Sequence, residues 1–433
     1  MAINQSRVRV VNSKCVAVVG LGYVGLPLAL AFAEAGFDVV GFERDPAKVD
    51  ALLSGFSHLQ DVSPQRLLDA LARGMEIHGS PESISRADLV IVAVPTPLDD
   101  SEGKPDLKMV LSAAEDIRGF LKRGVAVCLE STVAPGTTEG PFLGILSAAG
   151  FVADVDFFLG FSPERINPGM PQDDFLMTPK LISGISEGSL RVIAEFYSSV
   201  FDSVVPVRGI REAEFAKLLE NAYRLVNISF VNELAFASTR MGIDFGEVIR
   251  AAATKPFGFQ PFFPTAGAGG HCIPVDSVYL QNALEVSTGL PQEILATAIR
   301  INDNAVERFV EEIIGGETAV RDKSILVAGL AYKRGVSDMR NSAALKLIGV
   351  LGTLSAKVSV FDEIVGTVSV DGVTYQSIDL ESQDDPFDLV VLMHDFADDD
   401  QRRLLRLATR GCSASGFFGE IPSSRLISRS NSL

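Results

Sequence analysis

The sequence of 433 residues has no tryptophan, only four histidines and four cysteines, and its 38 basic residues are outnumbered by 55 acidic ones. The formal charge of -17 argues against a general nucleic-acid partner, because phosphate backbones are bound by surfaces rich in lysine and arginine. Any anionic substrate must therefore be bound by a few local donors. No segment approaches the roughly 20 uninterrupted apolar residues that a membrane helix needs, so no membrane partner is expected.

The few cysteines are scattered along the chain and form no paired metal-ligand spacing, so we expect no metal, and reduced thiols in a cytoplasm. The segment Met1–Lys14 carries basic residues before an apolar run, as a secretory leader does, but that run contains a glycine pattern that explains it better. With 47% hydrophobic and 21% charged residues, the composition is that of a folded globular protein. The length indicates two or three domains.

A glycine-rich turn follows the first apolar run. The run Cys15–Val19 predicts a buried parallel strand, and it leads into Gly-Leu-Gly-Tyr-Val-Gly at residues 20–25 and then a helical pattern. The next strand, Phe37–Phe42, ends in Glu43, 23 residues after the first glycine. The first two glycines let backbone amides and the helix N-terminus reach a pyrophosphate, and the third lets helix and strand pack closely.

Glu43 lies where a carboxylate can hold the ribose hydroxyls of adenosine and would repel the 2′-phosphate of NADP. The pattern therefore favours NAD as the cofactor, although the neighbouring Arg44 keeps NADP open. A packing turn that binds no ligand is the alternative interpretation.

Further apolar runs end in polar loops. Leu89–Val94 leads to Thr96, and Val125–Leu129 leads to Thr132. Ligands of doubly wound sheets bind at the carboxyl ends of strands, so both loops are expected to border the cofactor, although either threonine can instead cap a turn. The run Phe157–Phe161 predicts a strand that brings Ser-Pro-Glu-Arg-Ile-Asn-Pro-Gly, residues 162–169, to the same edge.

From about Arg211 to Met241 the pattern predicts one long helix with few breakers. At about 1.5 Å per residue it would span roughly 45 Å, which suits a strut between domains and a dimer interface. Lys217 and Asn221 are four residues apart and share a face of this helix. A solvated helix face is the ordinary explanation for such a pair, but their neighbours are apolar.

The stretch Gly-Ala-Gly-Gly-His-Cys-Ile-Pro-Val-Asp, residues 267–276, places Cys272 in flexible backbone beside His271 and four residues before Asp276. A thiolate is a strong nucleophile, and the imidazole can favour it electrostatically. Two interpretations stay open at this point: a reaction centre, or a glycine-rich turn with an inert buried cysteine.

A second nucleotide-fold pattern begins after a helical stretch at Glu293–Ile314. The segment Lys323–Tyr332 repeats the spacing of Lys14–Tyr23, but Ala331 replaces the second glycine and no third glycine follows. A mononucleotide diphosphate therefore fits better than a dinucleotide, and a structural duplicate without a ligand is the alternative. The sequence predicts an α/β protein with two Rossmann-like, doubly wound domains joined by a long central helix and a helical middle domain. The expected boundaries are residues 1–205, 206–318 and 319–433.

Several motifs in one order resemble the UDP-glucose/UDP-N-acetylhexosamine 6-dehydrogenase family of nucleotide-sugar dehydrogenases. The likeness is greatest to the UDP-N-acetylhexosamine branch and covers residues 14 to about 395. It rests on Gly-Leu-Gly-Tyr-Val-Gly-Leu (20–26), Val-Pro-Thr-Pro (94–97), Ser-Thr-Val-Ala-Pro-Gly-Thr-Thr (131–138), Ser-Pro-Glu-Arg-Ile-Asn-Pro-Gly (162–169), Lys217 with Asn221, Gly-Gly-His-Cys-Ile-Pro-Val-Asp (269–276) and Gly-Leu-Ala-Tyr-Lys (329–333).

The resemblance implies a four-electron oxidation of the C6 alcohol of a UDP-hexose to a carboxylate with two NAD⁺, in a cytoplasmic homodimer formed through the central helix. The active site would lie between the outer domains. By this resemblance Cys272 captures the intermediate aldehyde, and Lys217 and Asn221 stabilise the alkoxide at C6. Glu164 acts as the general base in thioester hydrolysis, and Thr132 and Asp276 position the water.

The resemblance also implies two sets of binding residues. Those expected at NAD are Gly20, Gly22, Tyr23, Val24, Glu43, Lys48, Thr96, Thr132 and Arg340. Those expected at the UDP-sugar are Glu164, Arg165, Lys217, Asn221, Phe262, Phe263, Gly269 and Lys333.

Three departures from the family pattern are present. Pro168 stands where the UDP-glucose branch often has a second glutamate, so no hydrolytic role is assigned there. Residues 264–268 replace a usual Pro-Gly-Pro-Gly, and Ser277 replaces a common proline, and these two changes concern the sugar pocket. Three other functions stay open: a UDP-glucose 6-dehydrogenase, a two-electron dehydrogenase of the 3-hydroxyacid type, and a sensor that binds NAD and UDP-sugar without turnover.

Overall fold

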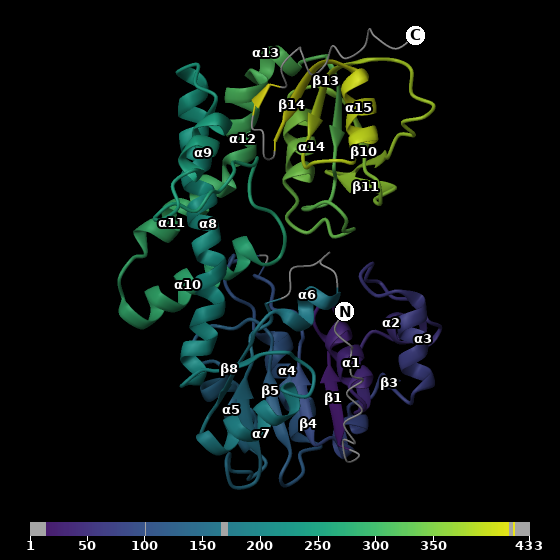
Figure 1. Cartoon of the computed structure of the whole chain (residues 1–433), viewed down its shortest axis with the longest axis vertical. Coiled ribbons are helices and arrows are strands. Elements are labelled where there is room, and N and C mark those ends of the chain that lie inside the picture. The colour runs from purple at the N-terminus through teal and green to yellow at the C-terminus, as the bar shows by residue number, and fades with distance from the viewer. Residues whose placement is uncertain (1–13, 100, 166–171, 415–418, 421–433) are drawn as a thin grey trace, which may run out of the picture. The chain divides into compact units, whose positions relative to one another are not determined.

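The computed structural model describes residues 14–99, 101–165, 172–414 and 419–420. The chain divides into two compact units, Met1–Leu219 and Glu220–Leu433, and the boundary falls inside one long helix, α8 (Ile210–Arg240). The predicted helix from Arg211 to Met241 is thus confirmed to within one residue at each end. Figure 1 shows both units and labels many of their helices and strands. Pro168, noted in the sequence, lies outside the described residues.

The first unit contains a sheet of eight strands in the order β3-β2-β1-β4-β5-β6-β7-β8. All neighbouring strands are parallel except the pair β6 and β7. Its strands are β1 (Cys15–Val19), β2 (Asp38–Phe42), β3 (Glu76–His78), β4 (Leu89–Val92), β5 (Ala126–Leu129), β6 (Phe158–Phe161), β7 (Lys180–Gly184) and β8 (Val204–Pro206).

Helices cover both faces of this sheet. In β1 alternate residues point to opposite faces: Val16 and Val18 belong to one apolar core, and Ala17 and Val19 to the other. The helical elements are α1 (Gly25–Glu34), α2 (Pro46–Leu53), α3 (Pro64–Ala72), the 3₁₀ turn η1 (Pro81–Arg86), α4 (Lys108–Arg118), the π-helical turn η2 (Thr138–Phe142), α5 (Leu143–Ser147), α6 (Gln172–Met177) and α7 (Glu187–Tyr197). The doubly wound fold predicted for this part of the chain is confirmed.

The second unit begins with helices and ends in a smaller sheet. Its helices, after α8, are α9 (Phe245–Ala253), α10 (Ile273–Thr288), α11 (Glu293–Asp303), α12 (Ala305–Phe309), the π-helical turn η3 (Val310–Ile314), α13 (Gly316–Val320), α14 (Ala343–Thr353) and α15 (Asp398–Arg406). The sheet order is β10-β9-β13-β14-β15, beside a hairpin of two strands. The strands are β9 (Ser324–Ala328), β10 (Lys357–Phe361), β11 (Thr367–Val370), β12 (Val373–Gln376), β13 (Phe387–Leu392), β14 (Ala408–Ser413) and β15 (Gly419–Glu420).

The expected helical stretch Glu293–Ile314 is not one continuous helix. It is interrupted at Asn304, whose backbone leaves the helical region and whose side chain donates to the carbonyl oxygen of Arg300 at 2.7 Å. A side chain that binds a nearby carbonyl competes with the helical ladder, which accounts for the break.

In the smaller sheet, residues of β9 alternate between two apolar cores. Ile325 and Val327 belong to the core that contains residues of α12 and α14, and Leu326 and Ala328 belong to the core that contains residues of α15. The second Rossmann-like pattern predicted from the sequence is therefore present. None of the described helices is long and apolar enough to cross a membrane.

The turn after β1 brings α1 unusually close to the sheet. A Cβ added at Gly25 would lie 1.8 Å from the carbonyl oxygen of Gly20, whereas a Cβ at Gly22 would meet no atom within 4 Å. Glycine at position 25 is therefore required by packing, and glycine at position 22 leaves open space beside the turn.

We expect Gly25→Ala to lower the melting temperature of the ligand-free protein by about 4–10 °C, because the added methyl group forces α1 away from the turn. Gly22→Ala is the matched control and should melt close to the wild type. Circular dichroism during heating measures both. Equal melting temperatures for the two variants would contradict this account of the turn.

Candidate active site

The predicted NAD-binding residues of the first unit lie around the turn after β1. Gly20 has a φ of +90°, which favours glycine. Glu43, directly after β2, accepts hydrogen bonds from the backbone amides of Leu21 and Asp45, both at 3.2 Å. The open space at Gly22 lies in the same turn. A tight glycine turn, room beside it and a carboxylate at the end of the second strand fit a dinucleotide.

Two other predicted cofactor residues gather near a histidine that the sequence did not single out. The ring of Tyr23 lies edge-on to His58 with 6.3 Å between ring centroids. Burial, and then the charge of Lys48, lower the pKa of His58. Val24 and Thr96 are partly exposed.

Arg44, the residue that left NADP as an alternative cofactor, forms hydrogen bonds with residues of α4. Its Nε donates to Asp116 Oδ2 at 3.2 Å, and its Nη2 donates to Ser112 Oγ at 2.8 Å. The guanidinium thus has partners on the protein itself.

A buried charge cluster lies at the carboxyl ends of β5 and β6. We define it as Glu130, Glu164, Lys180 and Tyr197. The ammonium of Lys180 lies 2.7 Å from Glu130 Oε2 and 3.3 Å from Glu164 Oε2, and it also donates to the carbonyl oxygen of Pro163 at 3.3 Å. The hydroxyl of Tyr197 donates to Glu130 Oε1.

The side chains of Lys180 and Glu130 are only 3% and 0% exposed, and that of Glu164 is 10% exposed. Burial raises the pKa of Glu130 to about 7, although the Lys180 ammonium opposes this. The pKa of Lys180 lies above its ordinary value, because the two carboxylates outweigh the effect of burial. Of this cluster the sequence singled out Glu164 alone. Glu130 directly follows the predicted strand Val125–Leu129, but Thr132 was chosen from that loop, and Lys180 and Tyr197 belong to no motif noted in the sequence.

A hydrogen bond joins two of the loops beside this cluster. Ser131, between Glu130 and the predicted Thr132, donates from its hydroxyl to the carbonyl oxygen of Val94 at 2.7 Å, which joins the loops after β4 and β5. Thr132 itself is partly exposed. Arg165 donates from Nη1 to the carbonyl oxygen of Pro179 at 2.8 Å.

On α8, Lys217 and Asn221 are both buried, at 8% and 7% exposed. Asn221 Nδ2 donates to Asp276 Oδ2 at 2.6 Å, and the amide of Asp276 donates to the carbonyl oxygen of Cys272 at 2.9 Å. Asn221, Asp276 and Cys272 thus lie together in the second unit. Asp276 is in the first turn of α10, and Cys272 is the residue directly before that helix.

The four cysteines differ in exposure. Cys272 is partly exposed, whereas Cys15, Cys128 and Cys412 are buried. Of the two interpretations of the glycine-rich stretch, the inert buried cysteine is therefore wrong as to burial. Among the described residues no cluster of histidine, cysteine and carboxylate side chains could hold a metal ion.

His271, next to Cys272, contacts a carboxylate and a guanidinium. Its Nδ1 lies 2.9 Å from Arg340 Nη2 and 3.3 Å from Asp338 Oδ2. Burial disfavours the imidazolium, but Asp338 and Cys272 outweigh it and raise the pKa of His271 to about 9. Although burial opposes it, hydrogen bonds from His271 and Arg340 hold the pKa of Asp338 well below its usual range. The predicted cofactor residue Arg340 is therefore paired with Asp338 beside the cysteine.

The glycines before Cys272 allow a close approach to the segment after β9. A Cβ at Gly269 would lie 2.6 Å from the carbonyl oxygen of Asn341, and one at Gly270, where φ is +85°, would lie 3.0 Å from the ring of Tyr332. The amide of Gly270 donates to the carbonyl oxygen of Arg340 at 3.1 Å. The sequence predicted flexible backbone here. In the structure the missing side chains of these glycines instead allow the loop to pack closely against the segment after β9.

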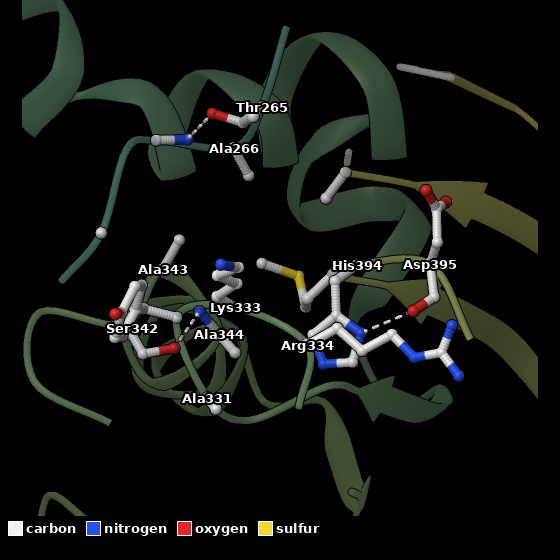
Figure 2. A pocket seen from close by; sticks show the side chains of 15 residues that line it. Thr265, Ala266, Ala331, Lys333, Arg334, Ser342, Ala343, Ala344, His394 and Asp395 are labelled. Carbon is white, nitrogen blue, oxygen red and sulfur yellow. Dashed lines mark hydrogen bonds between the residues drawn. The ribbon is translucent and has the colours of Figure 1, made fainter. Parts of the chain in front are cut away.

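A pocket of about 410 Å³ opens beside this loop, and Figure 2 shows the predicted Lys333 among the side chains that line it. Asp362, directly after β10, accepts from the amides of Leu330 and Ala331, as Glu43 does from Leu21. The other side chains drawn include those of Thr265, Ala266, Ala331, Arg334, Ser342, Ala343, Ala344, His394 and Asp395.

The pocket is partly filled at its glycine turn. A Cβ at Gly329 would lie 2.7 Å from the ring of His394. Gly329 corresponds to Gly20 of the first unit, where an added Cβ would likewise lie too close to the protein, 2.9 Å from the carbonyl oxygen of Ala93. The residue that corresponds to Gly22 is Ala331, which lines the pocket, so its methyl group takes up space that stays open in the first unit, and a mononucleotide suits the pocket better than a dinucleotide.

The two predicted aromatic residues of the sugar pocket differ. The ring of Phe262 packs edge-on against Tyr223 of α8, with 5.8 Å between centroids. Phe263 is 42% exposed.

Comparison with known proteins gives the family. Residues 14–201 match the NAD binding domain of the UDP-glucose/GDP-mannose dehydrogenase family, residues 211–304 its central domain, and residues 326–407 its UDP binding domain. The UDP-N-acetyl-D-glucosamine 6-dehydrogenase of Salmonella typhi is 35% identical over 361 residues, which cover 82% of this chain and 83% of the relative.

Two solved structures are similar. The UDP-D-ManNAc dehydrogenase of Pyrococcus horikoshii has a TM-score of 0.80 at 28% identity and covers 94% of this chain and 97% of its own. A UDP-glucose dehydrogenase of Pyrobaculum islandicum has a TM-score of 0.81 at 26% identity and covers 96% of both chains. By its domains and by its relatives, this chain belongs to the UDP-glucose/GDP-mannose dehydrogenase family, and its cofactor is NAD.

Proposed function

We propose that the chain oxidises the C6 alcohol of a UDP-N-acetylhexosamine to the carboxylate, through a thioester on Cys272. The observation that carries the proposal is the partly exposed Cys272 at the start of α10, beside the hydrogen-bonded pair Asn221 and Asp276. NAD⁺, when bound, supplies the hydride acceptor for two successive oxidations.

The thiol is needed because an aldehyde is a poor hydride donor. Loss of one hydride and one proton turns the alcohol into an aldehyde, and the sulfur of Cys272 then bonds to that carbon to give a thiohemiacetal. Loss of a second hydride and proton gives a thioester. Water adds to the thioester carbon, the carbon–sulfur bond breaks, and the acid and the free thiol are released.

Residues of both units are assigned to this chemistry. Lys217, buried on α8, stabilises negative charge on the C6 oxygen, and Asn221 four residues later donates to the same oxygen. Glu164 removes a proton from the hydrolytic water, which Thr132 and Asp276 position. The proposal requires that these side chains and Cys272 act on the same carbon atom.

The pocket beside Lys333 is assigned to the uridine diphosphate. Its lysine can pair with phosphate, and its glycine turn suits a mononucleotide better than a dinucleotide. Arg165, Phe262, Phe263 and Gly269 are proposed to bind or enclose the sugar. Arg340 is proposed to act near the cofactor.

The three-part division into residues 1–205, 206–318 and 319–433 accompanies this proposal, with nicotinamide chemistry in the first part and nucleotide recognition in the last. We further propose a cytoplasmic homodimer. Tyr223, Phe230 and Leu234, at helical spacing on α8, are 47%, 58% and 39% exposed, an apolar face that suits a second copy of the helix.

Wild-type protein should form two NADH per sugar, and Cys272→Ser should lower net acid formation by a factor of about 10³ or more, because no thioester can form. Cys412→Ala removes a buried thiol elsewhere and is the control. Absorbance at the NADH band and chromatography of the sugar nucleotide measure both products. One NADH per sugar with an active serine variant would instead favour the 3-hydroxyacid type of dehydrogenase, and no NADH with any UDP-hexose would favour a sensor.

A substrate panel tests the N-acetyl group. We expect kcat/KM for UDP-GlcNAc, UDP-GalNAc or UDP-ManNAc to exceed that for UDP-glucose by about tenfold or more, because a site built around a polar substituent rejects an analogue that lacks it. GDP-mannose is the control for the nucleotide. The alternative function, UDP-glucose 6-dehydrogenase, is correct if UDP-glucose has the highest value.

Phe230→Glu should convert the dimer to a monomer, because it places a charge on the apolar face of α8. Val373→Glu changes an apolar residue of β12 that is 52% exposed and should leave the dimer intact. Size-exclusion chromatography with light scattering gives the masses. A wild-type protein with the mass of one chain would refute the dimer.

A further inference from the structure

The buried charge cluster contains a cation that the proposed mechanism does not use. Lys180 is the first residue of β7 and its side chain is 3% exposed, so its ammonium has lost nearly all contact with water. Burial of an ammonium is costly unless carboxylates and hydrogen bonds compensate for it. Its retention therefore calls for a reason beyond packing.

The surroundings of this ammonium are charged on one side and aromatic on the other. Glu130 Oε2 lies at 2.7 Å and Glu164 Oε2 at 3.3 Å. The rings of Tyr197 and Phe201 lie with their centroids 5.8 Å and 5.4 Å from Nζ, within cation–π range. The ammonium is thus fixed in place from several directions.

We propose that Lys180 is a positioning residue that places a cation beside Glu164 and orients this carboxylate as the base that activates the hydrolytic water. The inference rests on the proposed function and adds to it a residue outside the family motifs noted in the sequence. In the hydrolytic step Glu164 takes a proton from water as the water oxygen bonds to the thioester carbon. The sulfur of Cys272 leaves with the bonding pair, and the proton passes to solvent.

The second carboxylate must be kept apart from Glu164 in any test. Lys180 donates to Glu130, and its remaining hydrogen bonds reach Glu164 and Pro163. Because burial raises the pKa of Glu130 to about 7, Glu130 titrates in the neutral range, and a Glu130→Gln background removes that titration. The titratable groups that face the cluster are Tyr197 on α7 and Cys128 on β5, and burial raises the pKa of both. They therefore stay neutral in the working range of pH, and the guanidinium of Arg165 lies next along the chain.

The test is the pH dependence of thioester breakdown. Wild-type enzyme, UDP-GlcNAc and NAD⁺ are mixed, the reaction is quenched in acid at set times, and intact mass gives the fraction of chains that carry the thioester. The rate of breakdown is measured from pH 5 to pH 9. In Lys180→Met the midpoint of the acid limb should rise by about 1–3 pH units, because Glu164 loses its adjacent cation. Lys180→Arg keeps the cation and should restore a midpoint close to that of the wild type.

Lys180→Met leaves Glu130 buried without a cation, and this variant can therefore fail to fold. A second pair of variants keeps the proposal testable in that case. Glu130→Gln removes that charge, and the double variant Glu130→Gln with Lys180→Met removes both. The double variant should have a midpoint about 1–3 pH units above that of Glu130→Gln. Melting temperatures show that both are folded.

Each outcome decides the inference. If Lys180 were purely structural, Lys180→Met would reduce the amount of active enzyme but leave the midpoint unchanged. Likewise, the Glu130→Gln variant and the double variant would have equal midpoints. Either result overturns the proposal. The proposed function is judged separately: it fails if the wild type forms no NADH or no thioester. Two NADH per sugar with unchanged midpoints would overturn only the role of Lys180.

Discussion

Parallel strands that end at one edge are the constraint on which the first unit depends. β1, β4, β5 and β6 run in the same direction and are hydrogen-bonded in that order, so the loops that follow them meet at one edge of the sheet. The glycine turn, Thr96, Thr132 and Glu164 are brought to that edge by this arrangement alone. Residues up to 144 positions apart, from Gly20 to Glu164, thus lie at one edge of the sheet.

The second unit achieves a similar convergence by a different route. Helix α10 begins directly after Cys272, α8 supplies Asn221, and the turn after β9 packs on the glycines at 269 and 270. Small residues let backbone segments approach where side chains would keep them apart. The result is a cysteine with defined neighbours, His271, Asp338 and Arg340, rather than one on a loose loop.

Patterns with a strict physical period were predictable from the sequence. Cys15–Val19 is an unbroken apolar run because both of its faces are buried, and the observed strand has the same bounds. The long helix α8 was also predictable, since no glycine or proline interrupts its sequence before Gly242. The interruption at Asn304 was missed, because its cause is one side-chain hydrogen bond within an otherwise helical pattern. Of the site residues, those in recognisable motifs were found, but Lys180 and Glu130 were not. A charged residue in or directly after a strand cannot be told from an exposed one until tertiary contacts bury it.

The unequal exposure of the four thiols has a practical meaning. Three sulfur atoms are enclosed in packed interior, and the fourth is open to reagents. An electrophile or peroxide in solution therefore meets essentially one target, and under the proposed mechanism a single covalent event at Cys272 would be enough to abolish the activity of a molecule that otherwise stays folded. By the same logic, titration with an alkylating agent can count competent molecules in a preparation.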